Sequence, residues 1–87
     1  MSLKDKLLAD LQDAMRKGDT LRRDTIRFLR AAITNEEVAR QVESLDDTGV
    51  AEVLQRQAKQ RRESIAEFKK ANRQELVVKE EAELAIL

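Results

Sequence analysis

Proline is absent from the entire chain, and glycine occurs only at Gly18 and Gly49. These two residue types interrupt helices most strongly, because proline removes a backbone donor and glycine loses the most freedom on folding. Most of the other positions hold strong helix formers: leucine, alanine, glutamate, arginine, lysine and glutamine. The sequence therefore predicts an all-α fold.

Apolar residues recur every three or four positions in four stretches, which is the spacing of an amphipathic helix. This pattern predicts a small bundle of about four helices, at approximately residues 3–17, 20–42, 47–71 and 74–87. Local residues support these limits. Ser2 and Asp5 match a capping box, Gly18 can end the first helix, and Asn72 can end the third.

The connections between the four segments are short, which favours antiparallel neighbours. Residues 20–42 and 47–71 are similar in length, and we expect them to form a long antiparallel hairpin. Phe28 and Phe68 fall on the apolar faces of these two segments, so both rings are expected in the core. A chain of 87 residues is enough for one small domain, and residues 1–87 are interpreted as a single helical domain.

Histidine, cysteine and tyrosine are all missing. Without the usual general base, thiolate nucleophile and zinc ligands, we expect no catalytic residue, no metal site and no cofactor. Basic and acidic residues each number 17, so the chain has no net charge that would attract DNA. The lack of cysteine, of a signal peptide and of a bilayer-spanning apolar run leads us to expect a cytoplasmic location without membrane contact.

Arg61 falls on the apolar face of the third segment, in line with Ile65. Arginine stays protonated, so a buried guanidinium needs an anionic partner. Residues 74–87 offer Glu83 as the expected partner and Glu80 as the alternate acceptor, an ion pair that would fix the register of the last two helices. In the alternative interpretation, the stem of Arg61 packs while its charged head reaches water.

Arg23, Arg27 and Arg30 form a ridge on the side of residues 20–42 opposite the apolar stripe. Guanidinium groups make forked hydrogen bonds to phosphate oxygens, so the ridge is a candidate RNA contact. The alternative is an ordinary solvated face that Asp24 and Glu37 neutralise. With both phenylalanines assigned to the core, no aromatic side chain is expected to stack on bases.

Residues 74–87 have a second apolar side, which consists of Val78, Ala82, Ala85 and Ile86. A helix that is apolar on two sides usually contacts two partners. We therefore expect this side to be covered by a missing tail domain, by a second copy of the chain or by another protein. The alternative is a frayed tail.

Two stretches resemble the GatB/YqeY family: RRDTIRFLRAAITNEE at 22–37, and LQRQAKQRRESIAEFKKANRQELVVKEEAELAIL at 54–87. The family pattern is recognisable in TIR at 25–27, AA at 31–32, NE at 35–36, QRR at 60–62 and EL at 83–84. Asn72 stands where members often have glycine, a departure that preserves the turn.

The resemblance implies a small helical protein similar to the C-terminal region of the B subunit of the tRNA-dependent amidotransferase. That enzyme is a carbon–nitrogen ligase with glutamine as its amide donor, and its catalysis belongs to a separate, larger domain. The chain resembles the N-terminal part of YqeY-like proteins, with their tail domain absent. The resemblance thus implies a non-catalytic accessory module associated with tRNA. The alternative is a protein-interaction or scaffold module that docks through residues 74–87 without binding RNA.

Overall fold

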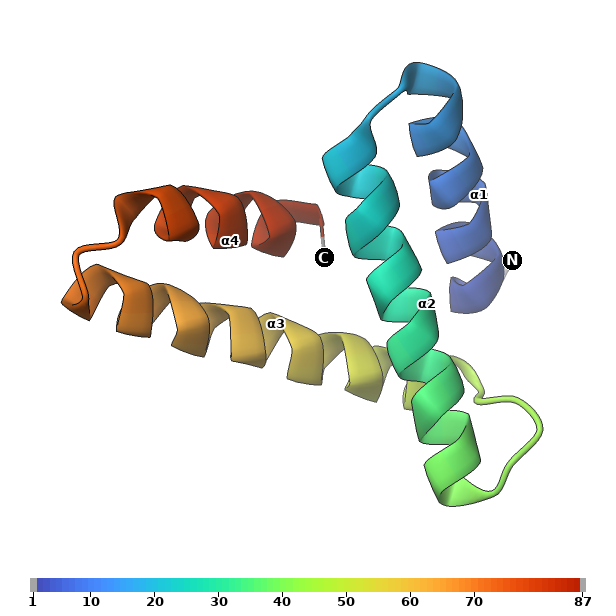
Figure 1. The fold of residues 1–87 in the computed structure, drawn as a ribbon. Helices are drawn as coiled ribbons and strands as arrows, with labels where there is room; N and C mark the ends of the chain where they lie inside the picture. The colour runs from blue at the N-terminus through green and yellow to red at the C-terminus, as the bar shows by residue number, and fades with distance from the viewer. Residues whose placement is uncertain (1, 87) are drawn as a thin grey trace.

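The computed structural model describes residues 2–86, which form four α-helices and no strand (Figure 1). They are α1 (Leu3–Lys17), α2 (Thr20–Arg40), α3 (Asp47–Lys70) and α4 (Gln74–Ile86). The all-α class and the four helices predicted from the sequence are confirmed. Within the same residues, no helix is long and apolar enough to cross a membrane.

Short polar side chains and left-handed residues set the helix ends. Ser2 and Asp5 form the expected capping box at the start of α1, and Gly18 ends that helix with φ 67°. The Asp46 carboxylate accepts a hydrogen bond from the Gly49 backbone N–H at 2.9 Å and thereby caps α3. Helix α2 ends at Arg40, slightly earlier than expected, because Gln41 adopts a left-handed conformation with φ 58°.

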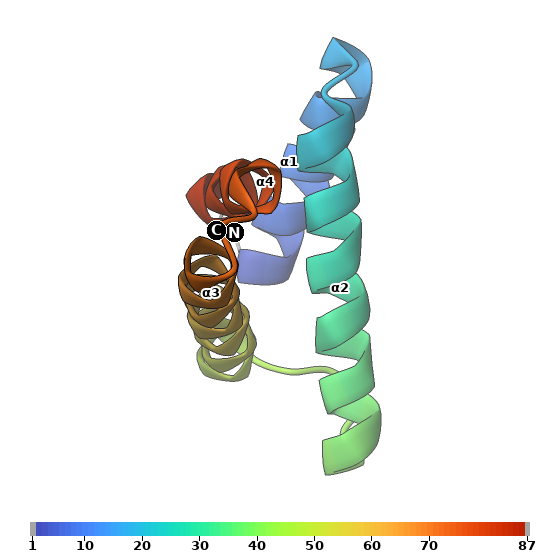
Figure 2. The same cartoon turned by 60° about the vertical axis from the view of Figure 1, so that its left-hand side comes forward.

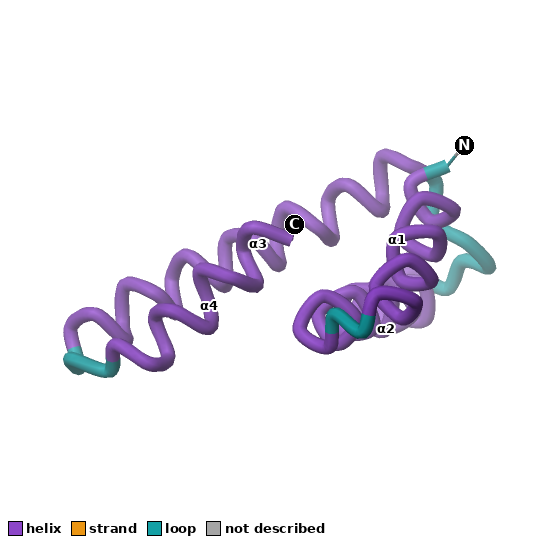
Figure 3. Tube along the Cα trace, turned by 90° about the horizontal axis from the view of Figure 1, so that it is seen from above, coloured by secondary structure: helices purple, strands orange, loops and turns teal. Residues whose placement is uncertain are grey.

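The pairing of the helices corrects the expectation of a long hairpin between residues 20–42 and 47–71. The most extensive contacts lie between α3 and α4 and between α1 and α2. Figures 1 and 2 show α2 crossing α3 rather than running along it, and Figure 3 shows α3 and α4 side by side as a separate pair.

The reason for the crossing lies in the polar residues of α3. Its inward face is apolar at Val50 and Val53 but carries Gln57 and Arg61 in the next two turns before Ile65. Only the first part of α3 can therefore pack on the apolar stripe of α2, and α4 covers the later part. Hairpin formation between α2 and α3 would place the polar residues of α3 against α2.

The centre of the molecule is built where the two helix pairs meet. One buried cluster joins Ile33 of α2, Leu45 of the following loop, and Val50 and Val53 of α3. Side chains from the other elements continue this core, namely Leu11, Ala14, Ile26, Leu29, Ile65 and Val77. Val77 is 1% exposed, so α4 is packed into the fold rather than projecting from it.

Candidate functional site

The three arginines of the ridge on α2 differ in their surroundings. Arg23 Nε donates to Asp24 Oδ1 at 2.9 Å, so this cation already has an anionic partner. Arg27 and Arg30 are exposed, and neither forms an ion pair with any residue in the range 2–86. Two of the three guanidinium groups are therefore free to contact an anion.

Most other arginines of the chain are neutralised by carboxylates. The arginines that form ion pairs are Arg16, Arg22, Arg23, Arg40, Arg56, Arg61 and Arg73. Arg22 is the clearest case, with NH1 2.8 Å from Asp13 Oδ2 and NH2 3.6 Å from Asp10 Oδ1. The hydrogen bond from Arg22 and the nearby Lys17 lower the pKa of Asp13 to about 2. Arg27, Arg30 and Arg62 have no ion pair among the described residues, and the first two lie together on one helix.

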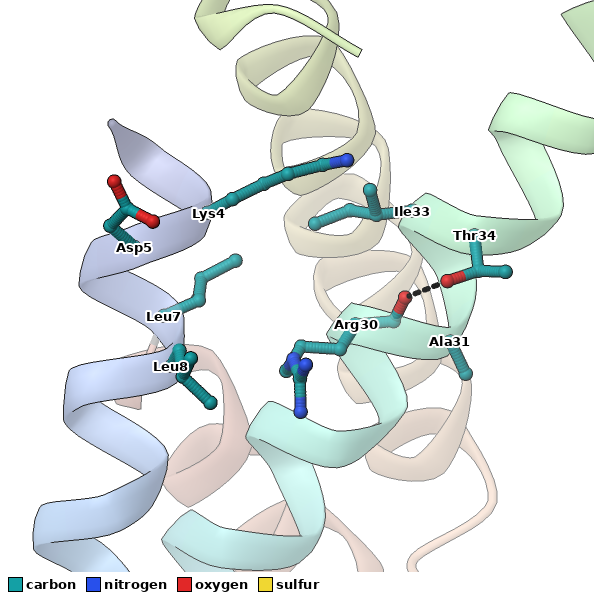
Figure 4. Close-up of a pocket in the computed structure, with 8 residues that line it drawn as sticks. All are labelled: Lys4, Asp5, Leu7, Leu8, Arg30, Ala31, Ile33 and Thr34. Atoms are coloured by element: carbon teal, nitrogen blue, oxygen red, sulfur yellow. Dashed lines mark hydrogen bonds between the residues drawn. The ribbon is translucent and has the colours of Figure 1, made fainter. Parts of the chain in front are cut away.

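A pocket of about 410 Å³ opens beside Arg30, between α1 and α2. Figure 4 shows Arg30 reaching from α2 towards α1, opposite Leu7 and Leu8. Lys4 also lines the pocket, but its ammonium forms an ion pair with Glu37 and donates to Ser44 Oγ at 2.8 Å. Arg30 is thus the basic residue of this pocket that has no carboxylate partner among the described residues.

Arg61 is 8% exposed, although it carries a permanent charge. Its NH1 donates to Gln57 Oε1 at 2.9 Å and to the Gln57 carbonyl at 3.3 Å. The structure also places its Nε 3.8 Å from Glu83 Oε2, and its Cζ lies 5.3 Å from the centre of the Phe28 ring. Gln57 and Phe28 were missed from the sequence, although Gln57 stands one helical turn before Arg61 on the same face.

Glu80 lies in the same pocket wall as Glu83 and Arg61. Burial raises the pKa of Glu80, and the charge of Glu83 and a hydrogen bond to it raise this pKa further. Arg61 acts in the opposite direction but does not cancel these effects. The structure therefore brings Arg61 close to Glu83 and also to Glu80, the alternate acceptor expected from the sequence. Glu80 holds its proton more firmly than an ordinary glutamate.

Phe28 corrects a second expectation, because its side chain does not lie in the core. It is 56% exposed, while its neighbours Ile26 and Leu29 are almost completely buried. The crossing of α2 and α3 leaves the flank of α2 that carries Phe28 uncovered. An aromatic surface is therefore available to a partner on the same helix as the free arginines.

Helix α4 presents both a buried and an open side. Val77 is buried, as expected for the inner face, whereas Val78 is 59% exposed. Ala85 is also exposed, and Ala82 and Ile86 are partly buried. Leu87 lies outside the described residues.

The sequence of the chain is similar to those of known proteins. The sequence profile of the family described as Yqey-like protein matches residues 4–87. The chain belongs to the YqeY-like family. The match includes α1 from its second residue, the other three helices, the ridge on α2, and both members of the Arg61–Glu83 pair.

Curated relatives of this YqeY-like chain carry the name Altered inheritance of mitochondria protein 41, mitochondrial. Those of Lachancea thermotolerans and Kluyveromyces lactis are each 41% identical to it over 81 residues, and that of Saccharomyces cerevisiae is 35% identical. The alignments cover 93% of the chain but only 43% to 44% of each relative. The chain thus spans less than half the length of these relatives.

These relatives correct the expectation of a cytoplasmic location, because they are mitochondrial by name. The expectation used the lack of cysteine and of a recognisable signal peptide. Neither feature identifies the cytoplasm, since a fold that needs no disulfide is compatible with several compartments.

Proposed function

We propose that this YqeY-like chain is a non-catalytic accessory module that binds RNA through Arg27 and Arg30 of α2. The observation that carries the proposal is the exposure of these two cations without a carboxylate partner among the described residues. Arg23 extends the ridge by one turn and can exchange Asp24 for a phosphate. tRNA is the RNA class that the resemblance to the amidotransferase B subunit suggests.

The chemistry of the ridge supports binding rather than reading of sequence. Guanidinium groups recognise phosphate oxygens through paired hydrogen bonds, which are the same for every nucleotide. Any carbon–nitrogen ligase activity in which the family takes part would then reside in a separate catalytic component.

The proposal is tested by titrating a fluorescently labelled tRNA transcript with the protein at low and moderate salt. We expect Arg27→Glu combined with Arg30→Glu to weaken binding at least about tenfold and to flatten its dependence on salt, because fewer counterions are released. Lys59→Glu combined with Arg62→Glu is the matched control, since both residues are exposed on α3, three positions apart, and neither has an ion pair among the described residues. Equal losses in both variants, or no binding by the wild type at low salt, would contradict the proposal.

A protein-interaction module docking through α4 is the second candidate. The exposure of Val78, at 59%, favours it, because this residue belongs to the apolar side of α4 that the fold leaves open. Sedimentation velocity at rising concentration tests self-association of this face. If the wild type self-associates, Val78→Asp should abolish the larger species. A wild type that stays monomeric at all concentrations would contradict docking of α4 on a second copy of the chain.

A further inference from the structure

Two pockets adjoin along the outer side of the α2–α3 crossing. One has a volume of about 380 Å³ and the other of about 400 Å³, and both are lined by Phe28, Gln57 and Gln60. The pockets therefore form one elongated depression, here called the crossing groove. Phe28 lies at its middle and is 56% exposed, so a large apolar ring is presented where the two pockets meet.

One end of the crossing groove is lined by small apolar side chains. Ala31, Ala32 and Ala39 of α2 lie there with Val53 of α3. Alanines allow another backbone to approach closely, and their positions on one helix extend the apolar surface over more than two turns. The charged residues at this end, Glu36 and Arg56, already form an ion pair at 3.1 Å.

The other end of the crossing groove is acidic. Asp24, Glu80 and Glu83 line it, together with the cations Arg61 and Lys79. Asp24 is paired with Arg23 and Glu83 with Arg61, which leaves Glu80 as the carboxyl group of this end without an ion pair among the described residues. Arg61 is nine-tenths buried beside Glu83, and its Nε has no hydrogen-bond partner in the structure. Glu80 is a partly buried carboxyl group next to a second one, and burial together with Glu83 raises its pKa. A cation placed near Glu80 would offset this unfavourable proximity.

We infer that the crossing groove is a docking site for an amphipathic helix of a partner protein that carries a lysine or arginine beside its apolar stripe. The apolar stripe lies on Phe28 and the alanines, and the basic side chain reaches Glu80. Exposed aromatic residues in such grooves commonly contribute a large share of the binding energy. Nucleic acid fits this groove poorly, because one end carries three carboxylates against two cations and its unpaired carboxyl group, Glu80, would face the phosphates.

This inference goes beyond the proposed RNA-binding function because it concerns a different flank of α2. Arg30 lines the pocket between α1 and α2 and is absent from both pockets of the crossing groove. Loss of RNA binding in the arginine variants would leave the groove intact, and loss of helix docking would leave the arginines exposed. The two proposals can therefore fail separately.

The test begins with selection from a display library of helical 16-residue peptides against the folded protein, with counter-selection on the Phe28→Ser variant. We expect enriched peptides to combine apolar residues at helical spacing with a lysine or arginine at one end of the stripe. Enrichment of acidic peptides, or of none, would overturn the inference.

Affinity of one enriched peptide is then measured for two pairs of matched variants, after circular dichroism has shown that each is folded. Phe28→Ser should weaken binding about tenfold or more, whereas Val38→Ser, at a residue that is 72% exposed on α2 but outside the groove, should not. Glu80→Gln should weaken binding about three- to tenfold, whereas the exposed Glu81→Gln should not.

Two further outcomes would contradict the inference. Equal affinity of all four variants would show that the peptide binds elsewhere. Chemical-shift changes that a tRNA transcript produces at Phe28, Gln57 and Gln60, and that the peptide does not, would assign the groove to nucleic acid instead.

Discussion

Arg61 Nε lies 3.8 Å from Glu83 Oε2, and both side chains are largely shielded from water. The same guanidinium donates to Gln57 on its own helix and lies over the ring of Phe28 on α2. Arg61 thus connects α3 with α4 and contacts α2, although its Nε has no hydrogen-bond partner within residues 2–86. Burying an unpaired guanidinium would be unfavourable for folding. The stability of the fold therefore depends on the residues that surround Arg61 where three helices meet.

We expect Arg61→Met to lower the free energy of unfolding by about 3 kcal/mol, because the substitution leaves the largely buried Glu83 carboxylate without its cationic partner. Glu83→Gln should cost less, about 1–2 kcal/mol, since Arg61 keeps its hydrogen bonds to Gln57. The double variant should lose less than the sum of the single losses, because a broken pair cannot be broken twice. Urea unfolding of the four proteins measures this coupling.

Arg62→Met provides the control for these variants, because Arg62 is the exposed neighbour of Arg61 and should change stability by less than about 0.5 kcal/mol. Additive losses for Arg61→Met and Glu83→Gln would mean that the guanidinium and the carboxylate are close without being coupled. The alternative from the sequence, a guanidinium solvated by water, would then describe the energetics better.

Glu80 should make the protein less stable at neutral pH than at mildly acidic pH. Its pKa is raised in the folded state by burial and by Glu83, so the folded protein binds this proton more tightly than the unfolded chain does. The contribution is therefore present below the ordinary glutamate pKa and is lost as the pH rises through the raised value.

Glu80→Gln removes this loss, because the amide can donate to Glu83 at every pH. We expect the variant to be more stable than the wild type at pH 7, by less than about 1 kcal/mol after solvent screening. The difference should shrink as the pH falls towards 4. Thermal melts across this range test the prediction, with Glu81→Gln as control, and a difference that is independent of pH would contradict it.

Local signals in the sequence predicted the helix limits well. The capping box at Ser2 and the left-handed Gly18 depend on residues a few positions apart, so their outcome does not require knowledge of the fold. The end of α2 was less predictable, because Gln41 adopts a left-handed conformation that glutamine rarely adopts. The proximity of Arg61 and Glu83 could also be predicted from the sequence, since the short turn at Asn72 fixes how α4 folds back on α3.

Helix pairing could not be derived in this way. The apolar stripes of α2 and α3 are compatible with a hairpin, and the polar Gln57 and Arg61 decide against it only once α4 offers Arg61 a carboxylate. The exposure of Phe28 follows from the same choice, because a ring at the edge of a stripe is buried only if the neighbouring helix runs alongside. The crossing groove could therefore not be predicted from the spacing of apolar residues in the sequence.

Two left-handed residues offer a route to higher stability. Gln41 and Asn72 have φ values of 58° and 57°, where a side chain is strained and glycine is not. We expect Gln41→Gly to stabilise the protein by about 0.5–1 kcal/mol, and Asn72→Gly to stabilise it less, because asparagine tolerates this conformation best. Urea unfolding would measure both differences.

Gly18→Ala is the reverse substitution and serves as the control. Gly18 has φ 67°, and a Cβ added there meets no atom within 4 Å, so the substitution tests backbone strain alone. It should cost about 1 kcal/mol. Destabilisation by Gln41→Gly would show that the helix end is held by the glutamine side chain rather than strained by it.

Asp13 should contribute stability that disappears in acid. Arg22 and Lys17 lower its pKa to about 2 in the folded protein, below the ordinary aspartate value near 4. The unfolded chain therefore takes up this proton first, and the contribution is present above about pH 4 and is lost as the pH falls towards 2. Asp13→Asn removes the ion pair that joins α1 to α2, so we expect the variant to be less stable than the wild type at pH 7, by a difference that becomes clearly smaller as the pH falls to 2.5.

Urea midpoints at pH 7, 4 and 2.5 measure this convergence. The lowered pKa values of Asp24, Glu36, Glu37 and Glu75 also make the protein acid-labile, but they affect wild type and variant alike and cancel in the difference. Asp10→Asn is the control, because Asp10 lies farther from Arg22, at 3.6 Å rather than 2.8 Å, and should matter less. A stability difference between Asp13→Asn and the wild type that is unchanged at pH 2.5 would contradict this prediction. Asp13 would then stabilise the packing of α1 on α2 through its neutral form and not through its charge.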